Sequence, residues 1–289
     1  MKYLRKIRIL LSVVLAMLIT LAAISQNQMF QYAFKWIKDI QFMQAVLALN
    51  IGVCAGWLIV SAVVGRIYCS SVCPLGTFQD FASWIYKKLY NHGKGRYCYS
   101  HPKNTIRYII LGGTIGMIII GCTIISLLTD PYIIYSEFIK NLFLPEYQAL
   151  MGKYVIPGIL GVLISIFLFF LVGGLAFYKG RTFCNTICPV GSLYSLVSRR
   201  SVFQLEIDPD LCTSCGLCRD ECKASCIDYQ KHTIDFSRCI MCMNCVNVCP
   251  SDAIKFTASR KGLSTPLMQS LNNPKLPQVT IDGPLSLNK

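Results

Sequence analysis

The sequence predicts an α-helical membrane protein with four transmembrane helices, arranged as a duplicated hairpin, followed by a small C-terminal α+β domain. Three observations carry this fold class. Of the 289 residues, 54% are hydrophobic and only 15% are charged, the apolar residues gather in long runs, and most of the 16 cysteines fall in repeated motifs. A soluble core that buried four such runs would need a much larger chain around it, so a bilayer is the expected surrounding.

Four charge-free runs are long enough to be transmembrane helices. A helix rises about 1.5 Å per residue, so roughly 20 residues cross a hydrocarbon core of about 30 Å. The first run begins basic and contains Ala22-Ala23, as a signal peptide would, but it lacks a clean small-x-small cleavage site, which favours an uncleaved anchor. The runs are Ile9–Ile24 (uncharged as far as Phe34), Ala45–Gly65, Tyr108–Thr129 and Tyr154–Tyr178.

The basic residues predict the orientation of these helices. They cluster before the first run, between the second and third, and after the fourth, whereas the other two connections are close to charge-balanced. By the positive-inside rule, both termini and the C-terminal domain face the cytoplasm, and we expect a multi-pass protein of the bacterial cytoplasmic (inner) membrane. Because the net charge of +14 lies beside the bilayer, it does not indicate a nucleic-acid partner.

Two duplications divide the chain. GRIYCSSVCPLG begins at Gly65 and GRTFCNTICPVG begins at Gly180, so a C-x3-C-P motif follows each inward-running helix in residues 1–200. In residues 201–257, CTSCGLCRDEC from Cys212 recurs as CIMCMNCVNVC from Cys239. The segments VFQLEI, HTIDF and AIKFTA alternate as short strands, and the cysteine loops should lead into short helices. Residues 258–289 are rich in Ser, Pro and Asn, which predicts a flexible or partner-docked tail.

The spacing C-x2-C-x2-C-x3-C is typical of 4Fe-4S ligation, in which the fourth cysteine of each copy serves the cluster of the other copy. Disulfides are disfavoured in the cytoplasm, and zinc sites do not use a repeated run of three such spacings. One predicted cluster takes Cys212, Cys215, Cys218 and Cys249, and the other takes Cys239, Cys242, Cys245 and Cys222. The segment Leu205–Thr257 resembles bacterial two-cluster ferredoxins, except that Lys223 replaces a proline and Cys226 is left unassigned.

The paired C-x3-C-P motifs supply Cys69, Cys73, Cys184 and Cys188 at the same predicted membrane depth. Three chemical roles are open for them: a third cluster or other metal site, two redox dithiols, or contacts that relay electrons. A purely structural use is the alternative, with Gly and Pro shaping the helix exit and cysteine serving as a small buried residue.

Doubled GRxxCxxxCPxG motifs on four apolar helices, followed by a two-cluster domain, resemble the NapH-type membrane ferredoxins, with related modules in the NosR and CcoG types. The resemblance implies electron transfer between the quinone pool and a protein redox partner, as a subunit of a quinol dehydrogenase complex. The alternative that it leaves open is a CcoG-like factor that reduces a metal or thiol while another enzyme matures. A membrane anchor for a soluble redox complex is a third and weaker hypothesis.

Quinone binding needs an apolar slot with polar groups that manage two protons. The two outward connections offer aromatic residues beside Asp39, Asp130, Glu137 and Glu146, although such aromatics are equally expected as bilayer anchors. A membrane haem held by paired histidines is not expected, because His92, His101 and His232 all lie outside the predicted spans.

Overall fold

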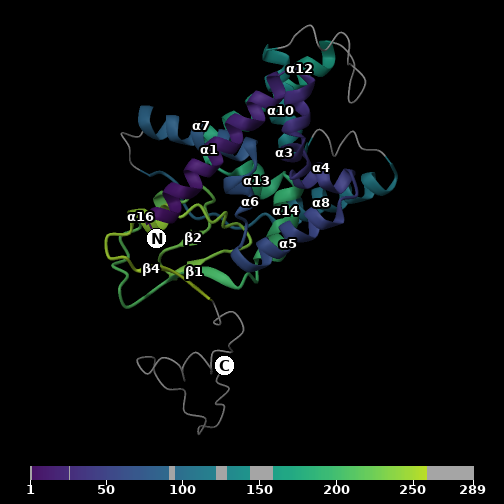
Figure 1. The fold of residues 1–289 in the computed structure, drawn as a ribbon. Helices are drawn as coiled ribbons and strands as arrows, with labels where there is room; N and C mark the ends of the chain where they lie inside the picture. Colours follow the sequence, from purple (N-terminus) through teal and green to yellow (C-terminus); the bar gives the residue numbers. More distant parts are fainter. Residues whose placement is uncertain (1, 26, 91–94, 122–128, 144–158, 259–289) are drawn as a thin grey trace.

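The computed structural model describes residues 2–25, 27–90, 95–121, 129–143 and 159–258. A helical part occupies one side of the molecule, and a small domain with short strands lies at the other, beside the start of helix α1 (Figure 1). The predicted tail lies, from residue 259 onward, outside the described residues. The order of elements therefore matches an apolar helical part followed by an α+β domain.

Two helices are long and apolar enough to cross a membrane. They are α1 (Lys2–Ile24) and α12 (Ile159–Lys179), by their segments Tyr3–Ile24 and Gly161–Lys179. The helices α5 (Ile51–Val64) and α8 (Asn104–Ile119) are apolar but shorter, with 14 and 16 residues. The third and fourth predicted spans extend into residues 122–128 and 154–158, which the structure does not describe. Four transmembrane helices therefore stay a prediction.

The predicted second span, Ala45–Gly65, is two helices rather than one. Helix α4 (Phe42–Leu47) ends before Leu49, whose φ of 52° is left-handed, and α5 starts after Asn50. The Asn50 side chain accepts a hydrogen bond from the Val53 amide at 3.3 Å, which caps the new helix. Two short helices, α2 (Gln28–Ala33) and α3 (Lys35–Asp39), lie between α1 and α4.

The helix that follows each C-x3-C-P motif packs on apolar helices of both sequence repeats. The first, α7 (Pro74–Leu89), packs on α12, α10 (Pro131–Phe143) and α1, with the Phe78 and Phe169 rings 4.2 Å apart. The second, α14 (Pro189–Ser198), packs on α5 and α8. Apolar burial thus joins the two repeats across each other, and the C-x3-C-P motifs lie where they cross.

The C-terminal domain contains the predicted strands and the predicted short helices. Strand β1 (Phe203–Ile207) pairs antiparallel with β4 (Ile254–Ala258), and β2 (Ile227–Asp228) pairs antiparallel with β3 (Thr233–Ile234). Helix α15 (Leu217–Asp220) begins after the second cysteine of the first copy, and α16 (Asn244–Val248) begins after the second cysteine of the second copy. The predictions are confirmed for β1, β3, β4 and the two helices, whereas β2 was not predicted.

Several polar contacts fasten this domain to the helical part. Arg5 of α1 donates to Asn244 at 3.1 Å, and Lys87 of α7 forms an ion pair with Glu221. The backbone amides of Arg96 and Tyr97 both donate to the Asp220 carbonyl, at 2.8 and 3.0 Å. The domain therefore has a defined position against the helices.

Candidate iron-sulfur sites and the paired cysteine motifs

Two pockets in the C-terminal domain are lined by the two predicted sets of four cysteines. The outer cysteine set lines one pocket, and the inner cysteine set lines the other. In each pocket the fourth cysteine comes from the opposite sequence copy, as the swapped pattern requires. The outer set is Cys212, Cys215, Cys218 and Cys249, and the inner set is Cys222, Cys239, Cys242 and Cys245.

The two sets lie at different depths. Cys215 of the outer set is exposed and its three companions are half-buried, whereas three of the four inner cysteines are buried. The inner set adjoins the helical part: Ile240 belongs to the same apolar core as Cys69 and Cys184, and Cys242 packs against that core. The inner set thus lies between the helices and the outer set.

The C-x3-C-P cysteines are buried around the starts of two helices. Cys73 and Cys188 are the N-cap residues of α7 and α14, with Pro74 and Pro189 in the first turn, where a missing N–H does no harm. The Gly191 amide donates to the Cys188 sulfur at 3.4 Å. The positive end of each helix therefore faces a sulfur atom, which favours its thiolate form.

Two buried arginines cross between the motifs. Arg66 of the first motif donates to the Cys184 carbonyl at 3.0 Å, and Arg181 of the second donates to the Cys69 carbonyl at 2.9 Å. Both side chains are at most 1% exposed. We call Arg66 and Arg181 the crossed arginines. Each of them therefore holds the backbone of the first cysteine of the other motif in place.

A second pair of buried arginines repeats this relation. Arg8 donates to the Ser70 carbonyl at 2.7 Å, and Arg107 donates to the Asn185 carbonyl at 2.8 Å; residues 70 and 185 each follow a first cysteine. In the described part of the chain, Arg66 and Arg107 have no carboxylate within ion-pair distance. Such buried cations need a nearby anion to offset their lost hydration.

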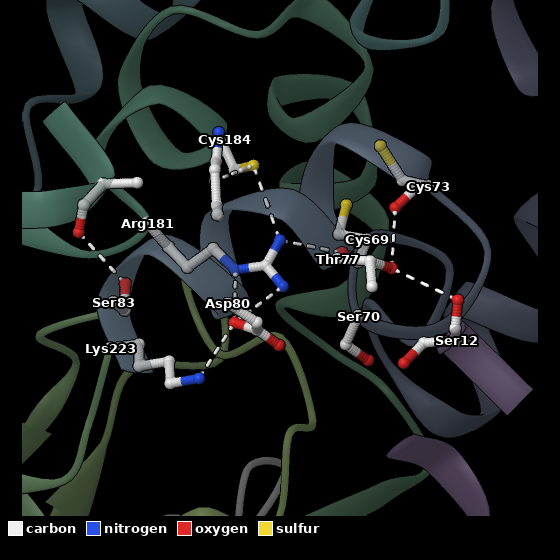
Figure 2. A network of polar contacts seen from close by, with 12 residues as sticks. Ser12, Cys69, Ser70, Cys73, Thr77, Asp80, Ser83, Arg181, Cys184 and Lys223 are labelled. Carbon is white, nitrogen blue, oxygen red and sulfur yellow. Dashed lines mark hydrogen bonds and ion pairs between the residues drawn. The ribbon is translucent and has the colours of Figure 1, made fainter. Parts of the chain in front are cut away.

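Asp80 of α7 is the acid of this region, and Figure 2 shows it between Arg181 and Lys223. It lies 3.0 Å from Arg181, 3.2 Å from Lys223 and 3.6 Å from Arg8. Burial raises the pKa of Asp80, but the three positive charges outweigh burial and hold the pKa well below its ordinary value. Lys223 replaces the proline of the ferredoxin pattern and thereby joins the C-terminal domain to this network.

The donor chemistry of the paired motifs fits a thiolate-ligated group. Burial raises the pKa of Cys69, Cys73 and Cys188, so ionising these thiols requires added positive charge, which a metal centre supplies. Among the described residues, no three His, Cys, Asp or Glu side chains are grouped closely enough for one metal ion. A cubane core spreads its thiolates more widely than a single ion does, and it suits four soft sulfur ligands.

We expect Gly191→Ala to weaken the packing between the two C-x3-C-P motifs. A Cβ at Gly191 would collide with the Cys184 carbonyl oxygen and approach Arg66, while one at Gly113 would meet nothing within 4 Å. Overpacking of this kind lowers the free energy of unfolding by about 1–3 kcal/mol. Denaturation in detergent should show the loss for Gly191→Ala and none for Gly113→Ala. Equal stability of the two variants would contradict the packing described.

Three of the predicted quinone-facing acids lie near one side chain: burial first, and then the charges of Asp130, Glu137 and Asp39, raise the pKa of Tyr132 at the start of α10. Asp130 is buried, accepts a hydrogen bond from Gln44 at 2.9 Å and binds the Tyr132 amide at the start of α10. Glu137 pairs with Lys140, and Asp39 is exposed. Glu146 and His92 lie outside the described residues. His101 stacks edge-on with Tyr99, and His232 lies 3.4 Å from the Ser214 hydroxyl.

Sequence reasoning missed several residues of the site. Arg66, Arg107 and Arg181 were counted as loop charges beside the bilayer, but the structure buries them against the motif backbones. A signal for Arg66 and Arg181 was present, because an arginine stands at the same place in both GRxxC copies, but Arg107 had none. Cys226 was also left without a role, yet its sulfur lies 3.4 Å from that of Cys222. This hydrogen bond lowers the pKa of Cys222 to about 7.

Comparisons with known proteins agree with this chemistry. One family model, described as a 4Fe-4S binding domain, matches residues 46–91 and 157–207, which hold both C-x3-C-P motifs. A second 4Fe-4S binding domain model matches residues 232–255. No solved structure matches the chain.

Similar curated proteins come from an archaeon and from bacteria. An uncharacterized protein of Methanocaldococcus jannaschii is 25% identical over 71% of this chain and 69% of its own length. The ferredoxin-type protein NapH of Escherichia coli is 28% identical over 66% of this chain and 62% of its own. The methylamine utilization ferredoxin-type protein MauN of Methylobacillus flagellatus is 26% identical over 55% and 48%. By these matches the chain contains 4Fe-4S binding domains and resembles the ferredoxin-type proteins NapH and MauN.

Proposed function

We propose that this protein is the membrane-bound electron-transfer subunit of a quinol dehydrogenase complex, which passes electrons from quinol to a protein redox partner. The observation that carries the proposal is the order of the three sets of cysteines. The paired-motif cysteines lie in the core of the helical part, the inner set adjoins that core, and the outer set reaches the surface. Such an order suits a path from the membrane to a soluble partner.

The proposal includes four transmembrane helices formed by α1, α5, α8 and α12 with their neighbouring segments. Its support is the low burial of α1 and α12, since only 17% and 28% of their most apolar segments are buried by the rest of the protein. Lipid would cover the remaining apolar surface of these helices. The basic residues that flank the runs support a cytoplasmic position for both termini and the C-terminal domain.

The eight cysteines of the inner and outer sets would hold two 4Fe-4S clusters, which supply the one-electron steps into which quinol oxidation must be divided. Oxidation of one quinol releases two protons and two electrons and forms one quinone. The protein's part is to hold sulfur ligands in a fixed order and to shield the inner set from water. Burial of Cys222, Cys239 and Cys245 does the shielding.

We further propose that Cys69, Cys73, Cys184 and Cys188 hold a third cluster. The support is electrostatic: Arg66 and Arg107 are buried without a carboxylate partner in the described residues, and four thiolates carrying a cluster would supply the missing negative charge. The crossed arginines hold the two motifs against each other, as a shared site requires.

Iron content tests the third site. We expect about twelve irons per chain in anaerobically reconstituted protein, and about eight in a Cys69→Ala/Cys184→Ala variant. Cys54 of α5, which belongs to none of the three sets, gives the matched control, because Cys54→Ala should keep all twelve. Eight irons in both wild-type and double variant would leave the paired motifs a structural role and refute the third cluster.

Quinol response tests the function itself. A reduced water-soluble quinol analogue, added anaerobically to the loaded full chain in detergent, should bleach the cluster absorbance near-stoichiometrically. Loaded protein that ignores the quinol but reduces Cu²⁺ after dithionite treatment would overturn quinol oxidation and favour a metal-handling role.

A further inference from the structure

The two four-cysteine pockets differ at one equivalent position. The sequence copies run CKASCI from Cys222 and CPSDAI from Cys249, so Cys226 corresponds to Ala253 at the repeat distance of 27 residues. Cys226 lines the inner pocket and Ala253 lines the outer pocket. The inner pocket therefore contains a fifth thiol where the outer pocket has only a methyl group.

This fifth thiol is held in place. Cys226 is 1% exposed, and its sulfur lies 3.4 Å from the sulfur of Cys222. Its carbonyl accepts a hydrogen bond from the Asp235 amide at 2.9 Å, and Ile227 after it enters strand β2. A ligating Cys222 is a thiolate and carries no proton, so in a loaded site the donor of this contact is the Cys226 thiol.

We propose that Cys226 is a positioning residue that raises the reduction potential of the inner centre. Hydrogen bonds to ligand sulfurs set the potentials of iron-sulfur clusters, because a donor stabilises the more negative, reduced state. Cys226 gives the inner centre this donor and Ala253 gives the outer centre none at the equivalent place, although the Ser251 hydroxyl lies 3.6 Å from the Cys249 sulfur of the outer set. The inference rests on the proposed assignment of the inner cysteine set.

The consequence is a shift in where electrons reside. With the Cys226 thiol in place, the inner centre, beside the helical part and away from the exposed Cys215, holds an electron more often than it would without that thiol.

Redox titration of the loaded full chain, followed by electron paramagnetic resonance, tests the proposal without quinol or partner. Cys226→Ala should lower one midpoint potential so that the electron moves about tenfold toward the outer centre, which is about 59 mV for a one-electron couple. Cys226→Ser, which keeps a donor, should restore most of the difference. Ala253→Cys, the mirrored change, should raise the other potential.

Iron content separates the outcomes. We expect Cys226→Ala to keep the wild-type iron content, since Cys226 is not counted as a ligand. Potentials that do not move in Cys226→Ala and Ala253→Cys would overturn the proposal, and so would the loss of about four irons from Cys226→Ala, which would make Cys226 a ligand instead. Wild-type protein without iron would refute the proposed function, whereas unmoved potentials in iron-loaded protein refute this inference alone.

Discussion

Cys245→Ala is expected to abolish electron transfer from quinol to an artificial acceptor and to remove about four irons per chain. Cys245 is buried, lines the inner pocket and belongs to the set that adjoins the helical part. Without this ligand the sequence of centres is interrupted between the membrane and the surface. Stopped-flow absorbance with a quinol analogue should then show no reduction of the outer centre.

A matched variant in the outer pocket distinguishes the order of the centres from a general loss of structure. Cys215→Ala should also remove about four irons, yet quinol should still reduce the inner centre, because Cys215 lies at the exposed end. The exposed Cys98, which lies in neither pocket, provides the control, and Cys98→Ala should behave as wild type. Quinol reduction of the outer centre in Cys245→Ala would contradict the proposed order.

Arg181→Ala is expected to lower the free energy of unfolding by about 3 kcal/mol. The change removes the ion pair with Asp80 and the hydrogen bond to the Cys69 carbonyl, both in buried surroundings. Loss of one partner of a buried ion pair costs about 3–5 kcal/mol, and the lower figure applies because Lys223 and Arg8 still face Asp80. Chemical denaturation in detergent measures the difference, with the exposed Arg199→Ala as control.

The loss of stability in Arg181→Ala should depend on pH in one direction only. The pKa of Asp80 is lower in the folded protein than its ordinary value of 3.8, so the ion pairs contribute fully above that value. Their contribution is lost as the pH falls through the lower folded pKa. The deficit of Arg181→Ala should thus stay constant from about pH 5 to pH 8 and shrink in stronger acid. A deficit that grows on acidification would contradict this assignment.

Local sequence pattern predicted the C-terminal domain well, because its signals are short-range. Cysteine spacing alone placed Cys249 with the first copy and Cys222 with the second, and the structure lines its two pockets in that way. The strand segments alternate over few residues, and β1, β3 and β4 form where this alternation predicts them, whereas the two-residue strand β2 was not predicted. The departure at Lys223 was visible, but its ion pair with Asp80 depends on tertiary contacts.

The helical part was less predictable, since hydropathy reports how apolar a run is but not where it bends. The break at Leu49 lies inside a charge-free run and depends on a single left-handed residue and the Asn50 cap. Burial of Arg66 and Arg181 could not be predicted from their loop positions, because their partners lie more than a hundred residues away. The sequence repeat indicated that the two motifs are equivalent, but not that the arginine of each motif binds the backbone of the other.

The crossed arginines also set a condition on biogenesis. Arg66 meets its acceptor only after Cys184 has been made, and the Ser237 carbonyl, another acceptor of Arg66 at 3.1 Å, is synthesised later still. A nascent chain that stopped between the two halves would leave this guanidinium without its native acceptors. Synthesis must therefore pass about four-fifths of the chain before Arg66 can reach all of its native acceptors, so the first half of the chain completes its packing late.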